Sequence, residues 1–134
     1  MTYESAKRAY TESSVLTATP EQLVVMLYDG AIRFLNQAAA ATEAGNREVA
    51  INRIRRADAI IDELNLSLDM SYGDVPQRLR SIYLFCKRQL RESIFERTSE
   101  PLLDTARLLG ELRDSWEQIA REAAATRAPL AATA

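Results

Sequence analysis

Residues 17–35 read TATPEQLVVMLYDGAIRFL, and this stretch contains both the start of a long helix and more apolar side chains than one helix face needs. Thr19 and Gln22 have the spacing of a capping box, in which each side chain accepts a hydrogen bond from the other residue's backbone N–H. Pro20 lies in the first turn, where a helix requires no N–H donor. The stretch therefore predicts a helix from Pro20 to about Ala44.

The helix that begins at Pro20 carries two apolar surfaces. At 3.6 residues per turn, the first surface is a stripe made of Leu23, Leu27, Ala31, Phe34 and Ala38. Val25 and Ile32 fall on the far side of the helix, with Tyr28 beside them. A surface helix of a small domain normally needs only one apolar stripe. We therefore expect the second surface to contact something outside the domain.

Three more helices are indicated by capping residues and apolar periodicity farther along the chain. Asn46 is a candidate N-cap for a second helix that ends at Tyr72–Gly73. Asp74 and Gln77 suggest a capping box at the start of a third helix, and Ser99 is a candidate N-cap for a fourth. Because the connections are short, each helix must run antiparallel to the one before it.

The predicted fold is all-α, an antiparallel up-down-up-down four-helix bundle. Only 4 Gly and 4 Pro in 134 residues favour long helices, and a chain of this length builds a single core. We divide the chain into an N-terminal arm or short helix at residues 1–18, the four-helix bundle domain at 19–125 and a flexible C-terminal tail at 126–134.

Charge and composition exclude several classes of protein. The net charge of −2 and the pI of about 5.3 argue against a general nucleic-acid-binding protein. The single cysteine, Cys86, cannot form an internal disulfide, as is typical of a reducing cytoplasm. No apolar run approaches the ~18 residues of a membrane span, and the N-terminal residues lack the apolar core of a signal peptide. We expect a cytoplasmic protein that does not insert into membranes.

The composition offers little catalytic chemistry. The chain has no histidine, which removes the commonest general base and the ligand sets of di-iron bundles. Its charged residues mix both signs and indicate solvated helix faces, while Cys86 falls on a core stripe. A helical enzyme that binds a small dianion would need several Arg side chains inside the bundle, and here they avoid the core stripes. We expect no enzyme, no cofactor and no metal site.

The first motif also carries a family resemblance. TATPEQL at residues 17–23, followed by MLYDGAI at 26–32, closely resembles the signature of the flagellar secretion chaperone FliS family, the flagellin-specific export chaperones. The resemblance covers roughly residues 10–119 and continues through SLDM at 67–70 and LRDSW at 112–116. The departures from the family pattern are Phe85, Cys86 and Gln89.

The resemblance implies a specific client. Members of the family bind the disordered C-terminal segment of flagellin, prevent its premature polymerisation and keep it competent for flagellar type III secretion. In the family the N-terminal arm covers part of the client groove in the free protein, so Tyr10, Val15 and Leu16 are the anchors expected here. The family also suggests the export apparatus and regulators as further partners.

Surplus apolar residues are the feature from which we predict the binding site. On the second helix, Leu66 and Met70 point away from the predicted core stripe. On the first helix, Tyr28, Asp29 and Gly30 are expected to shape the contact through a ring with a hydroxyl, a carboxylate and the close approach of another backbone. The candidate partner-binding residues are Tyr10, Val15, Leu16, Val25, Tyr28, Asp29, Gly30, Ile32, Leu66, Met70 and Tyr83.

A non-enzymatic, homo-oligomeric helical scaffold is the alternative from another class. In that case the surplus apolar stripes would pack against a second copy of the chain. A chaperone is expected to be a monomer or a weak homodimer that forms a complex with flagellin, whereas a scaffold would form a stable oligomer that ignores it.

Overall fold

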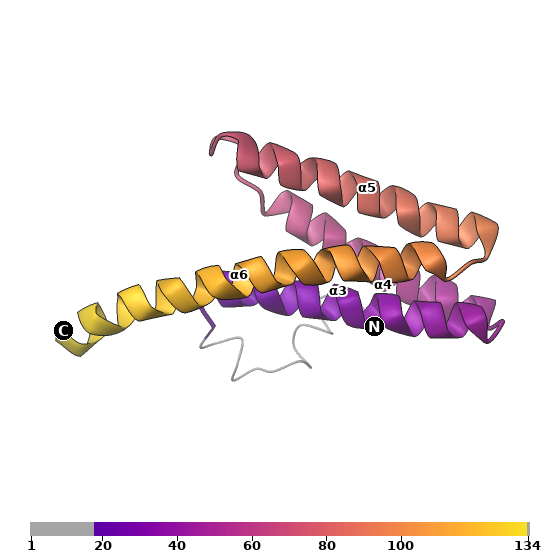
Figure 1. Cartoon of the computed structure of the whole chain (residues 1–134), viewed down its shortest axis with the longest axis horizontal. Coiled ribbons are helices and arrows are strands. Elements are labelled where there is room, and N and C mark those ends of the chain that lie inside the picture. The colour runs from indigo at the N-terminus through magenta and orange to yellow at the C-terminus, as the bar shows by residue number, and fades with distance from the viewer. Residues whose placement is uncertain (1–17, 134) are drawn as a thin grey trace.

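The computed structural model describes the backbone of residues 18–133 and the side chains of residues 18–126. Nearly all of this part is helical, in four helices and without strands: α3 (Pro20–Glu43), α4 (Arg47–Leu66), α5 (Asp74–Glu96) and α6 (Glu100–Thr133) (Figure 1). The predicted all-α fold is confirmed. The arm residues Tyr10, Val15 and Leu16 lie outside the described residues.

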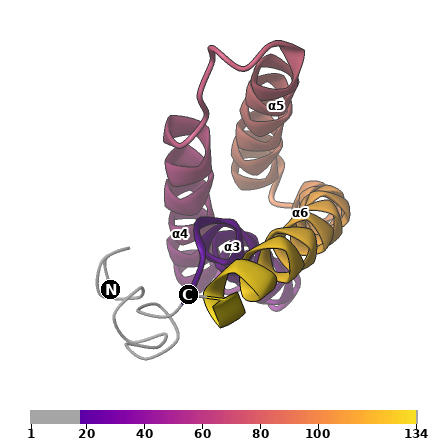
Figure 2. The same cartoon turned by 90° about the vertical axis from the view of Figure 1, so that its left-hand side faces the viewer.

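The helices form an antiparallel up-down-up-down bundle in which α3 and α5 are diagonal to each other. α3 packs extensively against both α4 and α6, whereas α5 makes fewer contacts with the same two helices. The end view in Figure 2 shows α5 standing apart from α3. In Figure 1, α5 and α6 are close at the turn that connects them and separate toward the other end. The bundle is thus tighter around α3 than around α5.

The first residues of α3, α4 and α6 lie where the sequence predicts the starts of these helices. The Thr19 hydroxyl oxygen accepts a hydrogen bond from the Gln22 N–H at 3.2 Å, and the Gln22 side-chain oxygen accepts from the Thr19 N–H at 2.8 Å, which completes the capping box. Asn46 accepts from the Val49 N–H at 3.3 Å and caps α4. α6 begins directly after Ser99, whose backbone carbonyl accepts hydrogen bonds from the first turn.

The connection between α4 and α5 differs from the prediction. α4 ends at Leu66 rather than at Tyr72–Gly73, and Asp74 is the first residue of α5 rather than its cap. The Asp69 carboxylate accepts hydrogen bonds from the backbone N–H and the hydroxyl of Ser71, so a local turn replaces the helix. The residue before α5 is a glycine with a φ of 69°, and no side chain caps this helix. The predicted capping box is therefore wrong.

α6 is the longest helix, and its C-terminal end extends beyond the bundle (Figure 1). The sequence predicts a flexible tail from residue 126, whereas the backbone is helical as far as Thr133. The Ala-rich composition of this stretch favours a helix. The division into arm, bundle and tail at residues 18 and 125 stays a prediction.

The core combines large side chains from all four helices with small ones on α3. The largest buried apolar side chains are Tyr28, Leu35, Ile61, Leu64, Tyr83, Leu90, Leu102 and Leu109. Ala31 and Ala38 of α3 are fully buried as well, and their small size lets neighbouring helices approach α3 closely. Cys86 is fully buried among these residues, as expected.

The buried face of α3 is wider than the predicted stripe and extends to the side of Tyr28 and Leu35. Ala31 and Ala38 lie in the core as predicted, but Leu23, Leu27 and Phe34 are only half-buried. The position along α3 decides this difference. Ala41 lies about five turns after Leu23 on the same line of the helix, yet only Ala41 is buried.

Leu109→Ala should lower the free energy of unfolding by about 2–5 kcal/mol, because it removes a fully buried side chain and leaves a cavity. Leu103→Ala, on the same helix but at a side chain that is 40% exposed, should cost less than half as much. Urea unfolding followed by circular dichroism measures both changes. Equal losses would contradict the described packing of α6.

Candidate functional site

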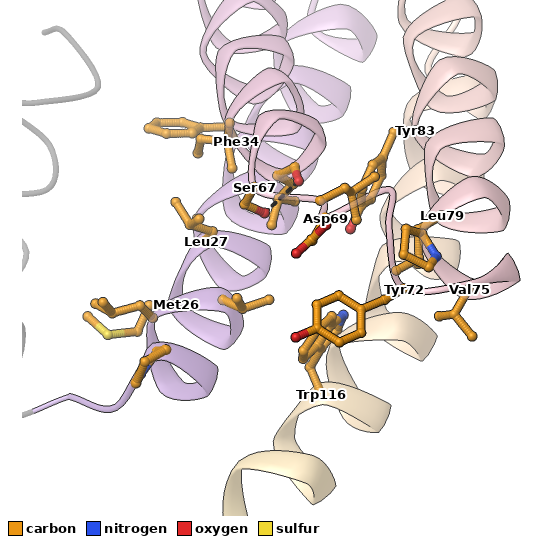
Figure 3. Close-up of a pocket in the computed structure, with 18 of the residues that line it drawn as sticks. Met26, Leu27, Phe34, Ser67, Asp69, Tyr72, Val75, Leu79, Tyr83 and Trp116 are labelled. Atoms are coloured by element: carbon orange, nitrogen blue, oxygen red, sulfur yellow. Dashed lines mark hydrogen bonds between the residues drawn. The ribbon is translucent and has the colours of Figure 1, made fainter.

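An apolar groove of about 610 Å³ lies at the end of the bundle where the α4–α5 connection crosses between helices (Figure 3). All four helices contribute to it, together with the connection itself. Most of the lining is apolar, and its larger side chains include Leu23, Leu27, Phe34, Leu68, Leu79 and Trp116. A concave, mostly apolar surface of this size is typical of a binding site.

The groove exists because α5 diverges from the rest of the bundle. α5 and α6 separate toward this end (Figure 1), and several side chains that pack against the core also line the groove. Leu27, Leu79 and Trp116 are of this kind, since each packs against buried residues and also lines the groove. Tyr72, in the α4–α5 connection, and Val75, at the start of α5, add apolar surface that is mostly exposed.

Two tyrosines connect the diagonal helices beside the groove. The hydroxyl oxygens of Tyr28 on α3 and Tyr83 on α5 lie 2.5 Å apart, and their ring centroids are 6.5 Å apart. Burial raises the pKa of both phenols, although their mutual hydrogen bond offsets part of the rise at Tyr28. Both hydroxyls therefore stay protonated at neutral pH, and the contact is a neutral hydrogen bond.

Asp29, predicted to contact a partner, forms an ion pair between helices. One of its carboxylate oxygens accepts a hydrogen bond from Nε of Arg113 on α6 at 2.9 Å. The same guanidinium also pairs with Glu117. The hydrogen bond to Asp29 raises the pKa of Arg113 despite its partial desolvation. Asp29 thus helps to hold α3 against α6, and its role toward a partner stays a prediction.

Two of the predicted site residues line the groove. Gly30 and Tyr83 do so, while Tyr28 is fully buried behind Tyr83 rather than at the helix flank where the sequence placed it. At Gly30 a side chain, not another backbone, makes the close approach, because a Cβ there would lie 3.2 Å from Cδ1 of Ile60. The local sequence YDG therefore packs against the core and reaches the groove at one edge.

The other predicted residues within the described part of the chain lie outside the groove lining. Val25 and Ile32 are half-buried on α3, and Leu66 and Met70 are exposed near the end of α4. Their contact with a partner stays a prediction. The sequence pattern on α3 assigned the lining residues of that helix to the core, so they were not predicted as groove residues. Tyr72 and Val75 were not predicted either, although apolar residues around a chain turn could have indicated them.

The described part of the chain contains no group of three or more His, Cys, Asp or Glu side chains that could hold a metal ion. No helix in the same part is long and apolar enough to cross a membrane. The fold and groove together define a helical binding protein.

The particular family follows from comparison with known proteins. The family described as Flagellar protein FliS matches residues 2–123, and the chain belongs to this family. The flagellar secretion chaperone FliS of Bacillus subtilis (strain 168) is 30% identical over 118 residues, which cover 88% of each chain. That of Vibrio cholerae is 31% identical over 120 residues, 89% of this chain and 88% of the relative. That of Salmonella typhimurium is 30% identical over 114 residues, 84% of each chain.

These comparisons confirm the resemblance found in the sequence. The relatives are named as chaperones, a non-enzymatic class, which agrees with the prediction of a binding protein rather than an enzyme. The similarity extends across most of each relative, so it includes the helices that form the groove.

Cys86 should be nearly inert toward thiol reagents in the folded protein. Burial raises the pKa of its thiol to about 11, and the reactive thiolate is therefore scarce at pH 8. Labelling with a chromogenic disulfide reagent should be many times slower in buffer than in concentrated urea, where the unfolded chain has an ordinary thiol. Rapid labelling without denaturant would contradict the position of Cys86 in the core.

Proposed function

We propose that this chain is a cytoplasmic flagellar export chaperone that binds the disordered C-terminal segment of flagellin. Bound in this way, flagellin cannot polymerise prematurely and stays competent for flagellar type III secretion. The observation that supports the proposal most directly is the apolar groove between α3 and α5, in a chain that belongs to a family of flagellar secretion chaperones.

The dimensions and chemistry of the groove suit the apolar face of a client helix. Leu23 and Leu27 line it from α3, and Val75 and Leu79 line it from the start of α5. An amphipathic helix presents side chains at intervals of three and four residues and can fill such a groove. Ordering a disordered segment costs several kcal/mol, so binding requires a substantial apolar contact. The uncovered apolar side chains that line the groove supply that contact.

Val75→Glu should weaken binding of flagellin at least about tenfold, because it places a charge against the apolar client face. Val75 is 64% exposed, so the substitution should leave the bundle folded. Phe95→Glu is the matched control, since Phe95 lies on the same helix, is 83% exposed and does not line the groove. Isothermal titration with a peptide of the flagellin C-terminal segment measures both variants.

Two outcomes would contradict this proposal. Equal affinity of Val75→Glu and the unchanged chain would place the client elsewhere on the surface. A stable oligomer in sedimentation experiments, with no change on addition of flagellin, would instead support the homo-oligomeric scaffold.

We further propose that the N-terminal arm covers part of the groove until the client arrives. The arm carries the apolar residues Tyr10, Val15 and Leu16, and the groove offers uncovered apolar surface next to the start of α3. Because the client must displace the covering arm, the free energy of client binding is reduced by the free energy that stabilises the closed state.

Deletion of residues 1–16 should therefore increase the binding of a hydrophobic fluorescent dye, or increase self-association, while circular dichroism shows the same helical fold. The fold should persist because the described core is built from residues 28–120. Tyr10→Ala should act in the same direction but more weakly. Unchanged dye binding after the deletion would refute the proposed covering role.

A further inference from the structure

The Tyr28–Tyr83 pair contains one more hydrogen-bond donor than it uses. Each phenol has one O–H donor, and a single hydrogen bond between the two oxygens engages only one of them. Within residues 18–126, neither hydroxyl has a further acceptor. One O–H group therefore remains to be satisfied from outside this part of the protein.

The positions of the two rings indicate which hydroxyl carries the spare proton. Tyr28 is 0% exposed and does not line the groove, whereas Tyr83 is 2% exposed and does. In Figure 3 the Tyr83 ring reaches from α5 toward the other labelled groove residues. A buried donor without a partner is costly, so the favoured arrangement has Tyr28 donating to Tyr83. The Tyr83 O–H is then the donor that an occupant of the groove can reach.

We infer that Tyr83 is a specificity-determining residue of the groove, where its hydroxyl donates a hydrogen bond to an amide carbonyl oxygen of the bound segment. This inference rests on the proposed binding of flagellin. The oxygen comes from an Asn or Gln side chain, or from a backbone carbonyl left free at the end of a client helix. A carboxylate suits this position poorly, because an apolar groove would strip its hydration. A segment without an acceptor here leaves the Tyr83 O–H buried and unpaired, and is rejected.

Tyr83→Phe and Tyr28→Phe form a matched pair that tests the inference. Each removes one hydroxyl and the same hydrogen bond between helices, but only Tyr83→Phe also leaves the buried Tyr28 O–H without an acceptor, so urea unfolding should show the larger loss of stability for Tyr83→Phe. Only Tyr83→Phe removes the donor that faces the groove. It should weaken binding of a peptide of the flagellin C-terminal segment about two- to tenfold, while Tyr28→Phe stays within about twofold.

Equal affinity of Tyr83→Phe and the unchanged chain, or equal weakening in both variants, would overturn the inference. Failure of the unchanged chain to bind the peptide would overturn the proposed function, and the inference with it, so the two failures are distinguishable.

Altered peptides identify the source of the oxygen. If a side chain supplies it, replacing one Asn or Gln by Leu should weaken binding to the unchanged chain but not to Tyr83→Phe. If the backbone supplies it, one amide of the peptide can be replaced by an ester, whose carbonyl is a weaker acceptor. This replacement should weaken binding to the unchanged chain but not to Tyr83→Phe. A peptide series in which no replacement depends on Tyr83 would refute the hydrogen bond.

Discussion

Close packing of α3 between α4 and α6 is the constraint on which the rest of the structure depends. Fully buried alanines on α3 allow both neighbours to approach it, and the large core side chains fill the space around them. One helix cannot contact three others equally, so α5 occupies the diagonal position and packs less tightly. The groove follows from this arrangement, because half-buried side chains of α3 remain uncovered where α5 diverges.

Polar contacts hold α5 in its diagonal position. The Tyr28–Tyr83 hydrogen bond links it to α3, and Lys87 donates to Asp58 and Asp62 of α4 at 2.8 and 2.6 Å. Partial burial lowers the pKa of Lys87, but these two carboxylates outweigh it and raise the pKa above its usual value, so the ammonium stays charged. These directional contacts hold α5 against α3 and α4, and none of the three charged residues lines the groove.

A chaperone with such a groove has to balance the exposure of apolar side chains for binding against the stability of its fold. Leu27, Leu79 and Trp116 contribute to the core through one side and to the groove through the other, so the same residues serve folding and binding. Substitutions at these positions would affect both properties. Residues such as Val75, which are largely exposed, allow the two properties to be separated experimentally.

The sequence by itself determined the four helices, the capping box at Thr19 and Gln22, the bundle and the family, because these depend on local hydrogen bonds, apolar periodicity and a contiguous motif. It did not determine how far the buried face of α3 extends around and along the helix. Tyr28 was expected at the surface and lies in the core, while Leu23 and Leu27 were expected in the core and line the groove. That outcome depends on two neighbouring helices whose positions no local pattern encodes, so only the tertiary structure decided where the groove lies.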